Sequence, residues 1–265
     1  MKILIPMAGE GKRFQEAGYK NSKPSILTYC IRTGKLEPMV VCAAKDLPGV
    51  VQDGSNVIFV ERTFHSEDGT ESKIKEFFPE AKFIKVDKLT EGQACTCLLA
   101  ENYIGKDEEL LIAGCDNGMV INRQKFDKER DECDVLVFTF RGDEAVNKNP
   151  NAYGWMKIDD KENIVGTSIK KSISETPLQD HAVVATFWFR EGNIFIKAAE
   201  KMIQENDRVN GEFYVDKVID HVIELGYKAK VFEIDRYIGW GTPKDYEEYQ
   251  STFEYWRNFI QEEEL

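Results

Sequence analysis

The chain has 265 residues, of which 42% are hydrophobic and 31% charged, and its formal net charge is −12 at pH 7. A chain of this length buries about three quarters of its unfolded surface, so it needs no disulfide or metal ion to fold. The acidic balance argues against a nucleic-acid-binding protein, because binding to the phosphate backbone requires clustered Lys and Arg. A phosphate site remains open, since a few basic residues can be focused in one cleft.

Membrane-spanning and metal-stabilised classes are also disfavoured. The sequence contains no run of about 18 apolar residues, and its apolar start is too short for a secretion signal, so we expect a cytoplasmic protein without membrane contact. The histidines are scattered and the cysteines lack paired C-x-x-C spacing, so free thiols in a reducing compartment are expected rather than a zinc site. The cysteines are Cys30, Cys42, Cys95, Cys97, Cys115 and Cys133.

The first half of the chain alternates short apolar runs with helical patterns. Strands are expected at 2–5, 56–60, 81–86, 109–114 and 134–140, a helix near Pro38 and another helix at 70–78. Such β-α-β alternation predicts an α/β fold, with a Rossmann-like, mixed but mainly parallel sheet flanked by helices. Ligands of such sheets bind outside the carboxyl ends of the strands.

The pattern changes after about residue 150. Three apolar runs joined by polar turns, at 155–158, 164–169 and 182–189, predict antiparallel strands. Helices are expected at 192–205 and 213–224, a strand at 228–234 and a charged surface helix from Lys244 onward. No repeat or Pro/Gly-rich linker divides the chain, so we expect a single domain over residues 1–265.

A glycine-rich loop directly follows the first predicted strand. Gly9 and Gly11 lack side chains, so successive backbone N–H groups there can close around a phosphate. Lys12 and Arg13 add positive charge beside those amides, and Lys23 lies ten residues further on. The alternative is an ordinary turn with solvated basic residues. The spacing is neither that of a Rossmann dinucleotide loop nor that of a P-loop.

The spacing instead resembles the signature of the sugar-phosphate nucleotidylyltransferase superfamily, A-G-x-G-x-R followed by a Lys-Pro element. The segment at 89–94 is similar to the base-reading turn of that family, and Thr90 with Gln93 also forms a capping-box pattern that predicts a helix start. At 110–117 a strand ends in Asp116, the position at which the family binds Mg²⁺. A strand-terminal turn residue is the alternative for this Asp.

Three later segments resemble the same family. Residues 153–155 and 165–171 are similar to its Y-G-x-V…E-K-P acceptor segment, with Lys171 on the phosphate-binding lysine. Residues 212–216 and 239–243 resemble its E-x-x-x-D and D-x-G-T-P elements. The matches run in the expected order from residue 3 to about residue 245. Bacterial capsule-type members of the family share two motifs with this chain, the start I-L-I-P-M-A-G and a late W-G-T-P.

The resemblance implies the fold of nucleotide-diphospho-sugar transferases, which is like that of GT-A enzymes. It implies a nucleotide-binding half over about 1–150, an acceptor-binding half over about 151–245 and a C-terminal helix over 246–265. The expected catalytic residues are Arg13, Lys23 and Asp116, with Mg²⁺ as cofactor. The expected nucleotide contacts are Ala8, Gly9, Glu10, Gly11, Lys12, Arg13, Lys23, Thr90, Gly92, Gln93 and Asp116. The expected acceptor contacts are Asn117, Tyr153, Gly154, Lys170, Lys171, Glu212, Asp216 and Trp240.

Two departures from the family pattern affect these expectations. Gly239 stands where many members have a second metal-binding Asp, so either Asp235 or Asp216 supplies that carboxylate or the ion keeps extra water. Lys170 replaces the Glu that accepts hydrogen bonds from sugar hydroxyls in the family. The replacement disfavours a hexose 1-phosphate and leaves a phosphorylated alcohol, amino-acid amide or choline-like acceptor open.

The function implied by the resemblance is transfer of a nucleoside monophosphate from a nucleoside triphosphate, CTP before UTP, to a small phosphorylated acceptor. Pyrophosphate is released, and capsule or surface-polysaccharide synthesis is the implied role. One alternative is a nucleotide-sugar glycosyltransferase of the same fold, although residues 116–118 read Asp-Asn-Gly rather than D-x-D. Another is a nucleotide-binding module without catalysis. Two copies could pair through the tail helix, and the sequence leaves this open.

Overall fold

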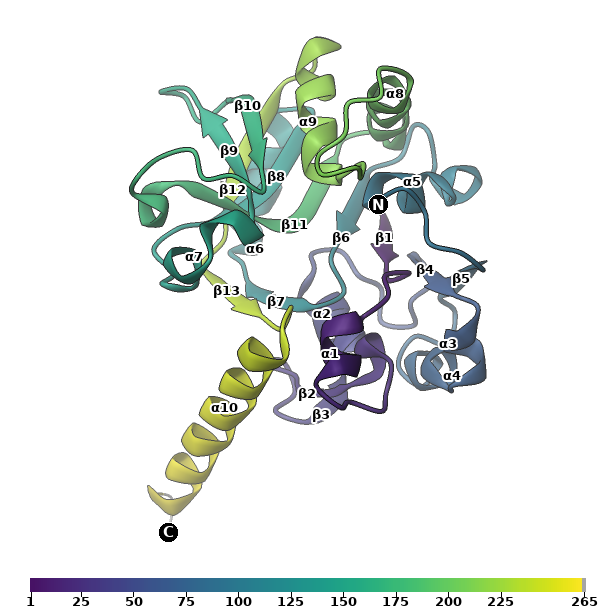
Figure 1. Cartoon of the computed structure of the whole chain (residues 1–265), viewed down its shortest axis with the longest axis vertical. Coiled ribbons are helices and arrows are strands. Elements are labelled where there is room, and N and C mark those ends of the chain that lie inside the picture. Colours follow the sequence, from purple (N-terminus) through teal and green to yellow (C-terminus); the bar gives the residue numbers. More distant parts are fainter. Residues whose placement is uncertain (264–265) are drawn as a thin grey trace.

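The structure is a computed structural model that describes residues 1–263, and its centre is one large mixed sheet (Figure 1). The strands lie in the order β10-β9-β11-β6-β1-β4-β5, while β8 pairs with β11 and β12 pairs with β8. Their bounds are β1 Lys2–Pro6, β4 Val57–Arg62, β5 Lys82–Val86, β6 Leu110–Ala113, β8 Val135–Phe140, β9 Gly154–Ile158, β10 Ile164–Ile169, β11 His181–Phe189 and β12 Ala229–Glu233.

The four strands β6, β1, β4 and β5 are parallel, as the β-α-β alternation predicts. β11 runs antiparallel to β6 and joins the second half of the chain to the same sheet. An irregularity between Val183 and Phe187 lets β11 pair with β9 at its start and with β6 at its end. Ala185, inside this irregularity, has a φ of 56°, in the left-handed region. The expected Rossmann-like, mainly parallel fold is therefore confirmed.

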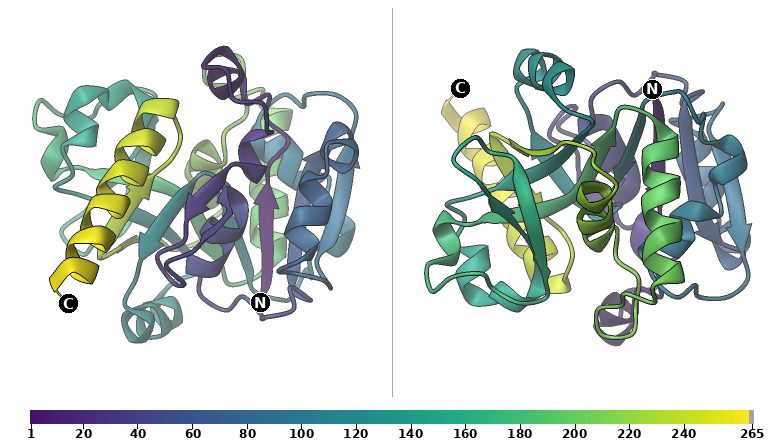
Figure 2. Two further views of the ribbon diagram at one scale, coloured as in Figure 1. Left: turned by 90° about the horizontal axis from the view of Figure 1, so that it is seen from below. Right: turned by 90° about the horizontal axis from the view of Figure 1, so that it is seen from above.

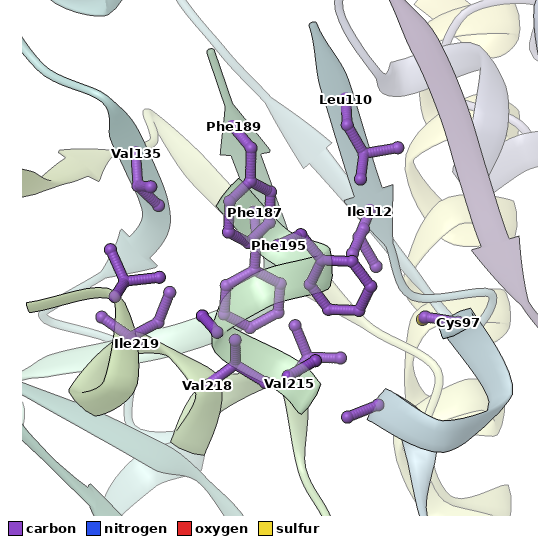
Figure 3. Packing of buried hydrophobic residues seen from close by; sticks show 14 of the residues in the cluster. Cys97, Leu110, Ile112, Val135, Phe187, Phe189, Phe195, Val215, Val218 and Ile219 are labelled. Carbon is purple, nitrogen blue, oxygen red and sulfur yellow. The ribbon is translucent and has the colours of Figure 1, made fainter. Parts of the chain in front are cut away.

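Helices cover both faces of the sheet (Figure 2). On one face, Phe187 and Phe189 of β11 pack against Phe195 of α8 and Val215 and Ile219 of α9 (Figure 3). These side chains are almost completely buried, so they contribute much of the hydrophobic stabilisation of that face. The helices are α1 Lys12–Glu16, α2 Met39–Asp46, α3 Phe64–Glu67, α4 Thr70–Lys75, α5 Gln93–Leu98, α6 Arg123–Glu129, α7 Ala145–Lys148, α8 Gly192–Gln204 and α9 Val215–Glu224.

Two small antiparallel ribbons were not expected from the sequence. The first consists of β2 (Leu27–Tyr29) and β3 (Leu36–Pro38). The second consists of β7 (Asn117–Val120) and β13 (Arg236–Gly239), and the amide of Trp240 donates a hydrogen bond of 3.0 Å to the carbonyl of Asp116. The second ribbon thereby brings the late Gly-Trp-Gly-Thr-Pro segment beside the end of β6.

The last helix, α10 (Pro243–Glu263), extends away from the body of the protein (Figure 1). Its first turns attach to β2, because the Tyr249 hydroxyl donates to the carbonyl of Tyr29 at 2.7 Å. Its later turns expose four large apolar side chains. These are Tyr255, Trp256, Phe259 and Ile260. Within residues 1–263 no helix is both long and apolar enough to cross a membrane, and all six cysteines are free thiols.

Candidate active site

The glycine-rich loop after β1 forms one wall of a cavity of about 510 Å³. Gly11 has a φ of 65°, a left-handed conformation that favours glycine, and precedes the first turn of α1. The segment from Ala8 to Arg13 lines this cavity together with Lys23, and Thr90, Gly92, Gln93 and Asp116 complete it. The structure thus gathers all the residues expected to contact the nucleotide around one cavity at the carboxyl edge of the sheet.

Lys23 and Asp116 meet at the centre of the site. The Lys23 ammonium lies 2.5 Å from Oδ2 of Asp116 and donates a second hydrogen bond, of 3.2 Å, to the carbonyl of Gly241. Burial acts to raise the pKa of Asp116, but the Lys23 ammonium and the Arg13 guanidinium outweigh it and hold that pKa below its usual range. Asp116 is therefore an ionised carboxylate with a cation already beside it.

The turn before α5 differs in detail from the capping-box expectation. A helix does begin in this segment, but it begins at Gln93 with Gly92 as its N-cap, later than a Thr90 cap would place it, and no side chain caps its amides. The Thr90 hydroxyl instead donates to the carbonyl of Gly92 at 2.9 Å and lies 2.6 Å from the Thr96 hydroxyl. Gly92 has a φ of 134°, and a Cβ there would lie 2.5 Å from backbone atoms of Phe213. This close backbone approach sets the turn conformation, and only glycine fits it.

A second cavity, of about 920 Å³, adjoins the first and shares Arg13, Gln93 and Asp116 with it. Its walls come from β13, the segment around α7, the first turn of α9 and one face of α10. Five of the expected acceptor contacts line it. These are Asn117, Tyr153, Gly154, Lys170 and Asp216.

Asp216 and Lys170 give this second cavity its charge. Asp216 lies in the first turn of α9, and burial raises the pKa of its carboxyl, while the charge of Lys170 acts in the opposite direction. The Lys170 ammonium donates a hydrogen bond to the carbonyl of Ala152 and lies 5.8 Å from the Tyr214 ring centre. Gly154 is packed against Asp216, because a Cβ there would lie 2.3 Å from Oδ1 of Asp216.

Three of the expected acceptor contacts do not line the second cavity. They are Lys171, Glu212 and Trp240. Lys171 is exposed and lines neither cavity, whereas Lys170, which follows the end of β10 with a left-handed φ of 58°, lines the second. Glu212 lines the first cavity, since Phe213 next to it pairs with the backbone of Glu91. Trp240 is completely buried and packs in a cluster with Phe14 of α1, the helix that follows the glycine-rich loop.

Of the three carboxylates expected to bind a metal ion, Asp116 alone lines the first cavity. Asp235 is exposed and lines neither cavity, and Asp216 lines only the second. Among residues 1–263, the two groups of three side chains that could hold a metal ion do not include Asp116. A Mg²⁺ ion here would take one protein carboxylate together with phosphate oxygens and water, an arrangement Mg²⁺ commonly adopts. Asp116 already pairs with a cation, the Lys23 ammonium, and its carboxylate oxygen is the type of ligand that Mg²⁺ takes.

Several lining residues were not among the expected contacts. Ala185 and Gly241 border both cavities, the first because of the irregularity in β11 and the second because of the β7–β13 ribbon. His65 and Phe64 close the first cavity from α3. One face of α10 could have been recognised from the sequence, because the residues that line the second cavity recur at helical spacing. They are Tyr249, Thr252, Phe253, Trp256 and Ile260.

No protein-family model matches the sequence, and no curated protein matches it. The fold does match solved structures. The nucleoside-diphosphate-sugar pyrophosphorylase from Vibrio cholerae RC9 has a TM-score of 0.74 at 18% identity, over 94% of this chain and 99% of that chain. The inositol-1-phosphate CTP transferase from T. maritima has a TM-score of 0.64 at 15% identity, over 92% and 90%. HddC from Yersinia pseudotuberculosis, complexed with GMP-PN, has a TM-score of 0.64 at 18% identity, over 95% and 99%.

Proposed function

We propose that this protein is a magnesium-dependent nucleotidylyltransferase of the sugar-phosphate nucleotidylyltransferase superfamily. It joins a nucleoside monophosphate unit from a nucleoside triphosphate to a small phosphorylated acceptor. The observation that carries this proposal is that two cavities meet at Arg13 and Asp116. The first contains the glycine-rich loop and the second contains a lysine and a buried carboxylate. Two substrates can therefore bind with their reacting groups at the shared boundary.

The reaction is an in-line displacement at phosphorus. An oxygen of the acceptor phosphate attacks the α-phosphorus, the bond from that phosphorus to the α,β-bridging oxygen breaks, and pyrophosphate leaves with the electron pair. A phosphate dianion is already nucleophilic, so no general base and no covalent intermediate are needed. The protein contributes positioning and charge neutralisation.

The first cavity supplies groups for the triphosphate. Backbone amides from Gly9 to Lys12 and the Arg13 guanidinium hold the β- and γ-phosphates, because N–H donors and a bidentate cation suit phosphate oxygens. Lys23 turns from Asp116 to the α-phosphate, where negative charge grows during the reaction. Asp116 would hold Mg²⁺, which when bound neutralises charge on the triphosphate.

The second cavity supplies groups for the acceptor. Lys170, rather than Lys171, orients the acceptor phosphate, since only Lys170 lines the cavity. Asp216 and the Tyr153 hydroxyl are available to the rest of the acceptor. Lys170 stands where the family has a sugar-binding Glu, so we propose a phosphorylated alcohol or amino-acid-type acceptor before a hexose 1-phosphate.

We propose CTP as the nucleotide, with UTP next, and a role in capsule or surface-polysaccharide synthesis in the cytoplasm. The support is the resemblance to capsule-type members of the family. The name of the T. maritima protein adds to it, because that protein is a CTP transferase with an inositol-1-phosphate acceptor. Gly92 lines the first cavity, and the segment around it resembles the base-reading turn of the family. We therefore propose that the nucleobase is selected at this turn.

A glycosyltransferase of the same fold is the second candidate. The glycine-rich loop with Arg13 disfavours it, since a glycosyltransferase releases no pyrophosphate that such a loop would bind. A nucleotide-binding module without catalysis is the third. The intact Lys23–Asp116 pair disfavours this candidate, because binding alone does not require it.

Release of pyrophosphate tests the activity. Each of the four nucleoside triphosphates would be combined with hexose 1-phosphates, phosphocholine, glycerol phosphates and phosphorylated amino-acid derivatives in the presence of Mg²⁺. We expect release that requires one triphosphate and one acceptor together. Binding of nucleotide-sugars alone, with no release across the panel, would favour the glycosyltransferase. Binding of triphosphates without release would favour the module.

A homodimer through α10 is proposed as well. The exposed side chains of Tyr255, Trp256, Phe259 and Ile260 form an apolar surface on the last turns of the helix. Exposed patches of this kind often mark protein–protein contacts. Sedimentation velocity on the wild type and on a Trp256→Glu/Phe259→Glu variant tests this. A monomeric wild type would exclude it.

A further inference from the structure

The C-terminal ends of α8 and α9 converge on one buried histidine that lines neither of the two cavities. His221 lies in the last turn of α9, Glu224 is the final residue of that helix, and Glu205 directly follows α8. The carboxyl end of a helix carries partial negative charge, so two such ends together attract a cation. Asp207 adds a third carboxylate on the other side of the imidazole.

One nitrogen of the His221 imidazole is a candidate metal ligand. Its Nε2 lies 3.1 Å from Oδ2 of Asp207, and a carboxylate accepts, so Nε2 carries the proton. In the neutral form of this ring, Nδ1 bears the lone pair that a metal ion would bind. Within the part of the chain that the structure describes, Nδ1 has no hydrogen-bond partner, although the side chain is only 1% exposed.

Two carboxylates face this free nitrogen. Nδ1 lies 3.2 Å from Oε2 of Glu224 and 3.6 Å from Oε2 of Glu205, and one ligand atom from each of the three residues lies within 4.8 Å of the others. Zn²⁺ binds histidine nitrogen and carboxylate oxygen at about 2.0–2.2 Å, and water completes four-coordination. Both glutamate side chains are about half exposed, so they are free to move the short distance that coordination requires.

Asp207 contacts the nitrogen of His221 that would not bind the metal ion. Metal-binding histidines commonly donate their second N–H to a carboxylate, which fixes the tautomer and the ring orientation. That contact is already made here. Lys217 holds Asp207 in turn, at 3.0 Å. We propose that His221, Glu205 and Glu224 form a binding site for a divalent transition metal, with Zn²⁺ as the best fit.

Lys201 occupies the cation position in this structure. Its ammonium contacts the carboxylate of Glu205 and lies 2.8 Å from Oε2 of Glu224. A dication interacts more strongly with two carboxylates than an ammonium does, and the partly exposed Lys201 can turn into solvent. The metal would tie the end of α8 to α9, whose first turn carries Asp216 of the second cavity.

Titration calorimetry with Zn²⁺ on the full chain tests this site, and the result does not depend on the proposed activity. We expect one equivalent of Zn²⁺ to bind. In a Glu205→Gln/Glu224→Gln variant the affinity should fall at least about tenfold, as expected when the ligand environment of a zinc site is disturbed. Both glutamates are at the surface, so this variant should fold.

Two further variants keep the outcomes distinct. Lys201→Met should bind Zn²⁺ more tightly than the wild type, because the competing ammonium is gone. Asp116→Asn should bind it as the wild type does, since Asp116 belongs to the other site. Co²⁺ in place of Zn²⁺ should give visible absorption bands of tetrahedral coordination that disappear in the double glutamine variant. Equal Zn²⁺ affinity in the wild type and the double variant would overturn the proposal, and so would loss of binding in Asp116→Asn alone.

Discussion

The Lys23 ammonium lies 2.5 Å from Oδ2 of Asp116, although the two residues are 93 positions apart in the sequence. The carboxylate proposed to hold Mg²⁺ thus has a counter-ion from the protein itself. A metal ion that binds without nucleotide must displace this ammonium. A bound nucleoside triphosphate, in contrast, provides phosphate oxygens to which the ammonium can donate instead. We therefore expect metal and nucleotide to bind together rather than separately.

Replacement of Lys23 by Met should change metal binding in the absence of nucleotide. The carboxylate of Asp116 loses its counter-ion, so Mn²⁺, used as a probe for Mg²⁺, should bind at least about tenfold more tightly than to the wild type. Electron paramagnetic resonance of free Mn²⁺ measures this directly. A Lys20→Met variant, which removes an exposed charge outside both cavities, is the matched control. Equal Mn²⁺ affinity in Lys23→Met and wild type would contradict the expectation.

Arg13 and Lys23 should each contribute strongly to the rate. Arg13→Ala or Lys23→Ala removes one charge-assisted contact with the phosphates, so kcat/KM should fall by on the order of 10²-fold or more. Steady-state kinetics of pyrophosphate release are the measurement, and Lys20→Ala again serves as control. Near-wild-type kinetics in both variants would remove these residues from the mechanism.

The two neighbouring lysines of the acceptor segment should behave differently. Lys170 lines the second cavity and Lys171 is exposed outside both. Lys170→Met should raise KM for the phosphorylated acceptor at least about tenfold, the value of one lost charge-assisted contact, with little change in KM for the nucleotide. Lys171→Met should leave both KM values near those of the wild type. The reverse pattern would restore the role that the sequence assigns to Lys171.

These two lysines show what the sequence could and could not predict. The strands, the order of the motifs and the residues around the nucleotide cavity follow from periodicity and from short motifs, because both are local. Which of two adjacent lysines points inward depends on the φ of 58° at Lys170 and on the packing of Tyr214 and Ala152, which lie far away in the sequence. Motif alignment alone therefore could not show that Lys170, and not Lys171, lines this cavity.

Trp240 illustrates the same limit. A tryptophan in the Gly-Trp-Gly-Thr-Pro segment, which resembles a motif of the family, suggests a ligand contact. The β7–β13 ribbon, which consists of two short strands with no strong signal, turns its ring into the cluster around Phe14 instead. The structure gives Trp240 a supporting role. It packs in the same cluster as Phe14, and the Lys23 ammonium lies 5.3 Å from the centre of the Phe14 ring.

The buried carboxyl of Glu61 should make stability depend on pH. Burial, and then the nearby charge of Glu71, raise the pKa of Glu61 to about 8. The unfolded chain ionises near the ordinary value of 4.5, while the folded chain keeps the proton up to about 8. The folded state thus binds more protons in this window, and stability falls as the pH rises from about 5 to about 8, by at most about 1.4 kcal/mol per pH unit from this group.

Replacement of Glu61 by Gln should remove that contribution while keeping the shape of the side chain. Urea unfolding between pH 5 and pH 8 measures the slope for both proteins. We expect a shallower decline of the free energy of unfolding in Glu61→Gln than in the wild type. Parallel slopes for the two proteins would show that Glu61 is ionised in the folded state.

Transfer of a labelled α-phosphate tests the proposed reaction most directly. CTP with ³²P at the α-position, and the other three labelled triphosphates, would be incubated with Mg²⁺ and the panel of phosphorylated acceptors. We predict that the label moves into a product containing the acceptor joined through a diphosphate, with one pyrophosphate released per product, and that Asp116→Asn loses this transfer. Label that stays in the triphosphate across the panel, while the protein transfers sugar from a nucleotide-sugar, would contradict the proposed function.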